Sequence, residues 1–497
     1  MILYTNPLKN PTLRKLKFAC SGMVKEYPHY SNFSLGILST PLLRYLLLII
    51  ITTGYGNAEK NVHFTPIFFS MTNSAGGDWH YKDELISING IGMDARANIN
   101  HWTIEARYIQ MGLFGNISQD LMDFSPNQSF PYLDGSKDAS GYWSEYATTK
   151  IVYHQDAFTF EMGKYDRHWG FGKRAIHISN KAPSYPQFGF RWKIKDNLKL
   201  TYFHGFLKSN IPDSSLAIYY QNQFSKRSLN VSRNIAAHQL EWTPFPKWTI
   251  SFNESVIYAV RGFDVHYLLG IIPLYQIENY LGDTDNVQLG CDIKYQFLSN
   301  TQLYLSFYMD ELTPEWLFKK NNHNWFAWQF GIHAKNILSN EDQFRAEYNW
   351  TDHRIYKHKF PVNDFYSHDE ALGFWAGPHA EEFLLNYEID MNNYHFISTF
   401  SHVKRGQVTQ EMLEDSYKSI YYERYTGTIP FESRISLSSQ VVRSFWNDKA
   451  SAYLGLQWID WKNAGFNPAE PSLDDVQDIS KFSINVGLTV SNQFLFD

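Results

Sequence analysis

The last stretch of the chain, residues 481–497, alternates apolar side chains with small or polar ones. Phe482, Ile484, Val486, Leu488 and Val490 are the apolar members, and serine, asparagine, glycine and threonine stand between them. Successive side chains of a strand point to opposite faces, so this pattern predicts one apolar and one polar face. The stretch is about twice as long as an average strand of ~5–6 residues. A strand that crosses a bilayer within a barrel needs ~9–11 residues and has one face in lipid, which fits this pattern.

The same alternation recurs through the second half of the chain. Residues 286–297, 302–310 and 344–350 each have an apolar face and a polar face. The polar faces carry full charges such as Asp292, Lys294, Arg345 and Glu347. The dry core of a soluble sandwich would not accept these charges, whereas a wet or hydrogen-bonded lumen would.

Connection lengths alternate as regularly as the side chains. Short turns are predicted near residues 98–101, 154–157, 194–197, 243–247, 297–300, 337–342, 390–393 and 446–449. Long connections fall between them, at residues 71–83, 113–142, 165–187, 208–233, 259–283, 311–324, 351–370, 402–430 and 462–480. Outer-membrane barrels sort their connections in this way, with short periplasmic turns and long extracellular loops. We therefore predict an all-β, antiparallel, transmembrane outer-membrane barrel of about 18 strands, with about 16 as the alternative count.

The beginning of the chain has the composition of an export signal. Basic residues precede a short apolar run at Tyr45–Ile51, and Gly56, Asn57 and Ala58 supply small residues for cleavage. This pattern predicts a cleaved signal peptide over residues 1–58, with Met1 or Met23 as the start, and a single barrel domain over residues 59–497. Removal of this leader takes Cys20 away, so Cys291 would have no partner for an intrachain disulfide.

Composition excludes several other classes. Aromatic residues make up 17% of the chain while its mean hydropathy is −0.38, which suits half-apolar strands and excludes a bundle of membrane helices. The net charge of −6 argues against a nucleic-acid partner.

Motifs of catalysis are absent, so we predict neither an enzyme nor a cofactor or metal site. Two weaker patterns would instead indicate a functional site. Glu381 and Glu382 could act as the carboxylate pair of a hydrolase. Asp352, His353 and His358 could bind a metal ion. A solvated loop is the preferred interpretation of the histidine pattern, and two carboxylates that are only neighbours in sequence are weak evidence for a hydrolase.

Residues 162–190 form the stretch richest in chemically versatile side chains. Aromatic faces stack on sugar rings, and amides and charges bind hydroxyls or carboxylates, so a sugar-binding surface is one interpretation and a self-packed loop in the barrel mouth is the other. The residues predicted to contact polysaccharide are Tyr165, Asp166, Arg167, His168, Trp169, Arg174 and Asn180, with Trp375 and His379 from a second segment.

Two segments resemble a known family. The sequence GKYDRHWGFGKRAIHISNKAPSYP at residues 163–186 and the sequence ALGFWAGPHAEEFLLNYEIDM at residues 371–391 resemble motifs of the Wzi capsule-assembly family, although Phe171 stands where proline is common. The resemblance implies an 18-stranded barrel in the outer membrane of a Gram-negative cell, surrounded by outer-membrane lipid. It also implies a non-enzymatic surface lectin that holds capsular or exported polysaccharide at the cell surface, with a monomer favoured. The alternative function is a passive porin or a sugar-selective channel, because a barrel of this size can enclose water.

Overall fold

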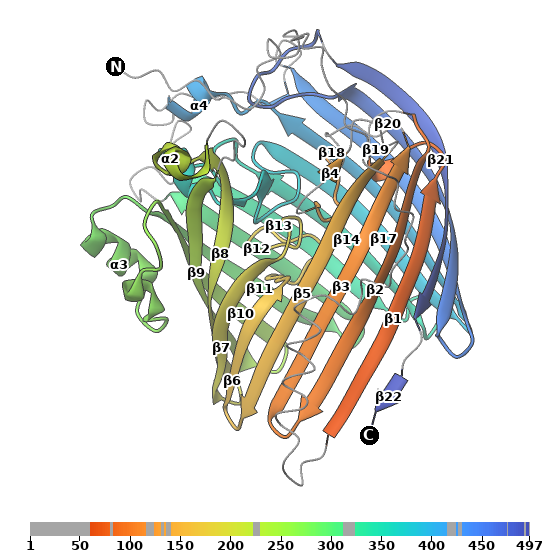
Figure 1. Ribbon diagram of the computed structural model, residues 1–497, viewed down its shortest axis with the longest axis horizontal. Helices are drawn as coiled ribbons and strands as arrows, with labels where there is room; N and C mark the ends of the chain where they lie inside the picture. The colour runs from red at the N-terminus through yellow and green to blue at the C-terminus, as the bar shows by residue number, and fades with distance from the viewer. Residues whose placement is uncertain are drawn as a thin grey trace, which may run out of the picture. The chain divides into compact units, whose positions relative to one another are not determined.

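The chain forms a closed antiparallel β-barrel of 18 strands, as the alternating pattern predicts (Figure 1). The structure is a computed structural model that describes residues 60–79, 83–115, 124–130, 134–135, 141–221, 229–311, 324–414, 424–425, 430–474, 476–491 and 494–496. The predicted signal peptide lies outside the described residues.

Each strand of the ring pairs antiparallel with the next, and the last strand pairs with the first, so no edge is left open. The strands of the ring are β1 (Lys60–Asn73), β2 (Ile86–Ile99), β3 (Trp102–Gly115), β5 (Gly141–Gln155), β6 (Phe158–Tyr165), β7 (Tyr185–Lys195), β8 (Leu198–Pro212), β9 (Asn230–Phe245), β10 (Trp248–Ala259), β11 (Asn286–Leu298), β12 (Thr301–Glu311), β13 (Trp325–Lys335), β14 (Asp342–Thr351), β17 (Ala380–Met391), β18 (Tyr394–Gly406), β19 (Phe431–Phe445), β20 (Ala450–Ala464) and β21 (Gln477–Ser491). Every predicted short turn joins two neighbouring strands of this ring.

Small elements complete the described part of the chain. They are β4 (Asp134–Gly135), β15 (Tyr366–Ser367), β16 (Glu370–Ala371), β22 (Phe494–Phe496), η4 (Gly77–Trp79), η5 (Ser214–Leu216), η6 (Val265–Leu268), η8 (Pro361–Asn363), α2 (Ala217–Tyr220), α3 (Leu274–Leu281) and α4 (Gln410–Glu414). Among the described residues, no helix is long and apolar enough to cross a membrane.

The closing strand has the predicted register. In β21 the side chains of Phe482, Ile484, Val486 and Leu488 are exposed on the outer face, by 42% to 57%. Ser483 lies in the same strand but is buried on the inner face. The apolar row therefore faces lipid, because a barrel in a bilayer turns its apolar face outward.

Most predicted boundaries lie within about four residues of the observed ones, and the connection after β14 differs most. The connection after β14 was expected to end at Glu370, but it continues to His379 and contains β15 and β16. The backbone explains the difference, since Gly377 has φ 76° and His379 has φ 52°, values that a continuous strand cannot adopt. The predicted strand at residues 481–497 begins earlier, at Gln477, and β22 is a separate strand that pairs with β1.

This register predicts how one position of β21 will respond to charge. Val486 is the middle member of the five outward apolar residues, and Arg on the lipid face costs ~2–4 kcal/mol at the bilayer midplane. We expect Val486→Arg to reduce the yield of heat-modifiable, folded barrel in phospholipid vesicles. Thr489→Arg, which places the same charge on the inner face, is the control and should fold with nearly the wild-type yield. Equal yields of the two variants would contradict the assigned faces.

Candidate functional site

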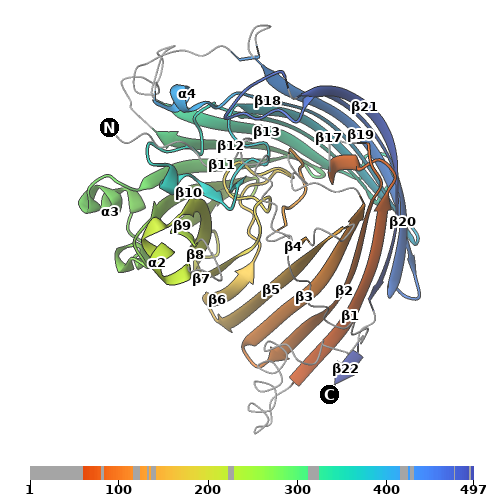
Figure 2. The same ribbon diagram turned by 45° about the horizontal axis from the view of Figure 1, so that its top comes forward.

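Two long connections fold into the lumen of the barrel. We call residues 166–184, between β6 and β7, the inner loop, and residues 352–379, between β14 and β17, the clamp loop. Figure 2 shows the yellow chain that follows β6 lying within the ring of strands. These loops pack with inward-facing strand residues into an apolar core that includes Trp169, Ile176, Tyr356, Phe374 and Trp375.

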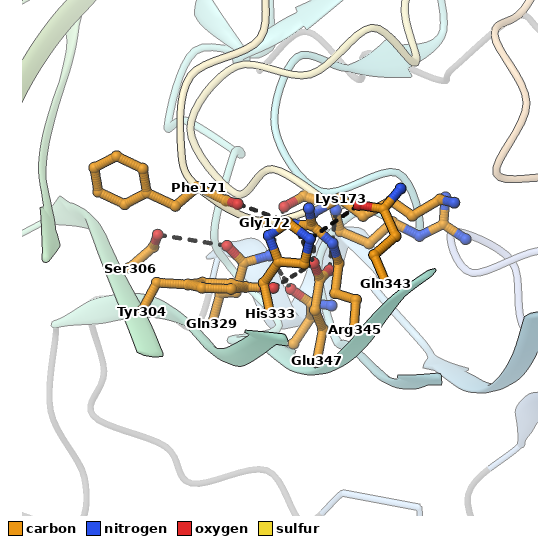
Figure 3. A network of polar contacts seen from close by, with 12 residues as sticks. Phe171, Gly172, Lys173, Tyr304, Ser306, Gln329, His333, Gln343, Arg345 and Glu347 are labelled. Carbon is orange, nitrogen blue, oxygen red and sulfur yellow. Dashed lines mark hydrogen bonds and ion pairs between the residues drawn. The ribbon is translucent and has the colours of Figure 1, made fainter. Parts of the chain in front are cut away.

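The tip of the inner loop is held by a buried carboxylate of β14. Glu347 accepts hydrogen bonds from the backbone N–H groups of Lys173 and Arg174, the latter at 3.0 Å, and from the hydroxyl of Tyr304 at 2.6 Å. The Arg345 guanidinium donates to the carbonyl oxygen of Phe171 at 3.0 Å. Figure 3 shows the loop tip lying over these strand residues. Because Glu347 is 1% exposed, its charge depends on these donors.

A second carboxylate fixes the Arg174 side chain. The Arg174 guanidinium donates to both oxygens of Glu382 in β17, at 3.1 and 3.2 Å. The same carboxylate accepts bonds from the Trp375 indole N–H at 2.8 Å and from the Ser401 hydroxyl at 2.7 Å. Such a two-pronged arginine pair combines charge with fixed geometry. It joins the inner loop, the clamp loop and the wall in one network.

The remaining part of the inner loop is anchored on the strands beside it. The His177 imidazole lies 3.0 Å from the buried carboxylate of Asp292 in β11. Arg167 bonds to Glu161 and lies 4.2 Å above the ring centre of Phe203. We call the buried acids Asp292, Glu347 and Glu382 the carboxylate wall, since all three face the lumen and hold this loop.

The clamp loop closes over the inner loop from the other side. The backbone N–H of Tyr356 donates to Asp310 of β12 at 2.8 Å, and the Tyr356 hydroxyl donates to the carbonyl of Ile176 at 2.7 Å. The backbone N–H of Ser179 also donates to the carbonyl of Leu372 at 2.6 Å. Direct backbone bonds of this kind fix the position of one loop against the other.

The structure places the predicted sugar-contacting residues in different surroundings. Arg174 and Trp375 meet at Glu382, and Arg167 bonds to the Tyr165 hydroxyl at 2.8 Å. His379 is separate, and its imidazole bonds to the carbonyl of Gln407 at 2.6 Å. Three of the predicted residues are exposed, namely Asp166, His168 and Asn180, and four are buried, namely Tyr165, Trp169, Trp375 and His379. Their assignment as ligand contacts stays a prediction.

The carboxylate wall was not among the predicted site residues. The sequence alone places Asp292 and Glu347 on the polar faces of strands and Glu382 beside Glu381. No local pattern in the sequence indicates that a distant loop forms hydrogen bonds to these three carboxylates. Glu381 and Glu382 alternate along β17, and Glu381 bonds to Tyr348 and Lys404 on the outer face. Because the two carboxylates point to opposite faces, they cannot act together on one substrate.

The opposite wall of the lumen is not covered in this way. On the inner faces of β2 and β3, Arg107 donates two bonds to Asp94, at 2.6 and 2.7 Å, and Arg96 lies 3.6 Å from Glu105. The side chains of Arg96 and Arg107 are 59% and 48% exposed although they face the inside of the barrel. We call these four residues the exposed charge cluster.

The described residues contain no group of three or more histidine, cysteine, aspartate or glutamate side chains that could hold a metal ion.

Comparison with known proteins gives similarity in fold. No family model matches the chain, and no curated protein matches it. Among solved structures, OccAB2 of Acinetobacter baumannii matches with a TM-score of 0.47 and 9% identity over 88% of this chain and 98% of that one. OprD of Pseudomonas aeruginosa matches with a TM-score of 0.43 and 10% identity, over 88% of this chain and 96% of that one.

These findings correct the expected family. The resemblance to the Wzi capsule-assembly family is wrong: no family model matches the chain, and the solved structures that match it are of Occ and OprD proteins. The surface lectin and the capsular polysaccharide partner, which that resemblance implied, are overturned with it. A physical reason for the error lies in Arg174 and Trp375, whose aromatic and charged side chains are engaged in bonds within the lumen.

The clamp loop carries buried histidines that predict an acid response. Burial lowers the pKa of His353 and His358 to about 4 and that of His379 to about 3. Each group favours its neutral form when folded, so its stabilisation is complete above the unfolded pKa of ~6.5 and is lost as the pH falls below that value. The loss is about 1.4 kcal/mol per pH unit for each histidine until its folded pKa is reached.

We therefore expect the clamp loop to loosen between pH 6.5 and 4 while the strands stay protected. Hydrogen exchange, corrected for the intrinsic rate at each pH, should show protection of residues 352–379 falling at pH 4.5. A variant with His353→Asn, His358→Asn and His379→Asn should lose most of this pH dependence, and His368, whose pKa burial also lowers to about 4, accounts for the remainder. Protection that is unchanged in the wild-type protein down to pH 4.5 would contradict the expectation.

Proposed function

We propose that the protein is a non-enzymatic channel of the Gram-negative outer membrane that passes small hydrophilic solutes through its lumen, beside the inner loop. The observation that carries this proposal is the contrast between the two lumen walls. The carboxylate wall is buried beneath loops, whereas the exposed charge cluster on β2 and β3 remains accessible to water.

The exposed charge cluster supports a water-filled passage on physical grounds. Ionised side chains require water or a full set of partners, and each ion pair of the cluster uses only part of its hydrogen-bonding capacity. Exposed charges also continue around the inner wall, because Arg191 of β7 and Lys199 of β8 have exposed side chains. Both signs are present, which suits polar or charged solutes rather than apolar ones.

The lining of the proposed path becomes apolar toward the long-loop end. There the inner faces of β1, β2 and β3 carry an apolar cluster that includes Ile86, Ile88 and Leu113, with Phe69 and Met111 packed against it. Hydrophobic constrictions next to a wet lumen can gate passage by excluding water. We propose that solutes meet this apolar segment and the inner loop in the same part of the channel. Of the predicted ligand contacts, Asp166, His168 and Asn180 are exposed and are therefore the ones that a passing solute could reach.

Ion selectivity tests the passage directly. Arg107→Gln removes one positive charge from the lumen and leaves Asp94 without its partner, so the channel should shift toward cations. We expect a roughly twofold change in the cation-to-anion permeability ratio, measured as a reversal potential in planar bilayers under a salt gradient. Asp196→Asn is the matched control, because Asp196 is 98% exposed in the turn between β7 and β8 and lies outside the lumen. A folded wild-type barrel that shows no conductance would overturn the proposed function.

The inner loop provides a second test. Glu347→Gln keeps the size of the side chain but removes the negative charge of the carboxylate that accepts hydrogen bonds from the Lys173 and Arg174 N–H groups. Each hydrogen bond to a charged group contributes about 1.5–3 kcal/mol to stability. We expect a loosened loop and therefore larger and noisier single-channel currents. Glu388→Gln is the control, since Glu388 binds the partly exposed Lys173 ammonium group at 3.2 Å and supports the loop less. Identical currents in the two variants would contradict a loop that restricts the lumen.

A further inference from the structure

One long connection of the barrel lies on the outer wall instead of in the lumen. The chain between β10 and β11 contains η6 and α3, and α3 stands outside the ring of strands in both views (Figures 1 and 2). Tyr267, Leu274 and Ile277 of this connection pack against outward-facing residues of β8, β9 and β10. We call residues 265–281 the outer-wall segment.

The outer-wall segment covers polar groups that would otherwise face lipid. Glu254 of β10 belongs to the outward row, since it follows Phe252 on the same face and pairs with Leu289, and both of these apolar side chains are exposed. The Glu254 carboxylate accepts the backbone N–H groups of Leu274 and Tyr275, at 2.9 and 2.8 Å. These groups belong to the first turn of α3, where unbonded N–H groups and the helix dipole favour a negative charge.

Further bonds join the segment to the wall. The His238 imidazole lies 2.8 Å from the Glu254 carboxylate, so the buried acid also has a partner on β9. The Tyr202 hydroxyl donates to the carbonyl of Tyr267 at 2.7 Å, and the Tyr258 hydroxyl accepts the backbone N–H of Asp264 at 3.0 Å. The connection therefore supplies hydrogen-bond partners to Tyr202, Glu254 and Tyr258 on the outer faces of β8 and β10.

The outer side of the same segment is apolar. Its exposed apolar and aromatic side chains are Val265, Leu268, Leu269, Ile271, Ile272, Tyr275 and Tyr280, with Ile271 at 71% and Tyr280 at 80%. From 265 to 281 the sequence contains one residue among Asp, Glu, Lys and Arg, and this residue, Glu278, is buried. Charges gather at the two ends instead, where Arg261 bonds to Asp264 and Asp285.

We infer that the outer-wall segment lies in the bilayer, with its exposed apolar side chains in the boundary between lipid headgroups and acyl chains. Three observations support this placement. The apolar surface is continuous with the lipid-facing row at Phe252 and Leu289, and exposed Asp, Glu, Lys and Arg side chains occur only beyond the ends of the segment. The segment also removes Glu254 from lipid. Interfacial helices combine an apolar face with tyrosine side chains at the same depth. The inference depends on the barrel spanning a membrane and is independent of conduction through its lumen.

Position-specific quenching of a fluorophore tests this placement. In the full chain with Cys20→Ser and Cys291→Ser, a single cysteine is introduced by Ile271→Cys or Tyr280→Cys, labelled with an environment-sensitive fluorophore, and reconstituted in phosphatidylcholine vesicles. Phe252→Cys serves as the lipid-facing control and Asp196→Cys as the aqueous control. We expect brominated acyl chains to quench the label at residues 271 and 280 by at least half of the quenching at residue 252. Aqueous iodide should quench strongly only at residue 196.

Two results would overturn the inference. Strong iodide quenching at residues 271 and 280, with none by brominated lipid, would place the segment in water. Shielding from both quenchers, combined with self-quenching that rises with the protein-to-lipid ratio, would show that a second copy of the chain covers it.

A charge substitution gives an independent readout. Ile271→Asp should lower the hydrogen-exchange protection of residues 265–281 in vesicles at least fivefold, whereas Val260→Asp, which changes an exposed residue before the segment, should leave it unchanged. Unchanged protection in both variants would also overturn the inference.

Discussion

The closed ring of backbone hydrogen bonds is the constraint on which the rest of the structure depends. A chain in a bilayer cannot leave N–H and C=O groups unpaired, so its strands must pair on both sides, and the β1–β21 ladder completes that requirement. Once the ring is closed, every strand has one face in lipid and one in the lumen. The inner faces can then carry charges that the outer faces cannot, and this asymmetry decides where polar chemistry lies in the molecule.

Charged side chains on the inner faces of the strands have two different roles in this barrel. On β11, β14 and β17 the carboxylate wall is buried because the N–H groups and cations of the inner loop replace water around it. On β2 and β3 the side chains of the exposed charge cluster remain accessible to water. The same residue types therefore fix a loop on one wall and hydrate the lumen on the other. The difference arises from which loops fold inward, and this is a property of tertiary structure rather than of any single strand.

The sequence predicts the barrel well because alternation and turn length are local properties. Each strand and each short turn can be recognised from its own residues, and the ring follows by joining them. The inner loop is different, because Arg174 bonds to Glu382 and its backbone bonds to Glu347, residues that are distant in the chain. A loop rich in aromatic and charged side chains has the same composition whether it displays them to a ligand or buries them in a lumen. Composition therefore suggested a sugar surface where the structure has a buried network.

One local feature of the sequence, a charged residue in the lipid-facing row of a strand, nevertheless indicates a tertiary contact. The outward row of β10 consists of Trp248, Ile250, Phe252, Glu254, Val256 and Tyr258. A carboxylate in the middle of an otherwise apolar row would be costly in lipid. Its presence therefore means either that this stretch is not a membrane-spanning strand or that another segment packs over the carboxylate and supplies hydrogen-bond donors. The strand is intact, and α3 supplies the donors. An isolated charge in a lipid-facing row thus indicates a segment folded over the outer wall, just as a buried charge on the inner face indicates a loop folded into the lumen.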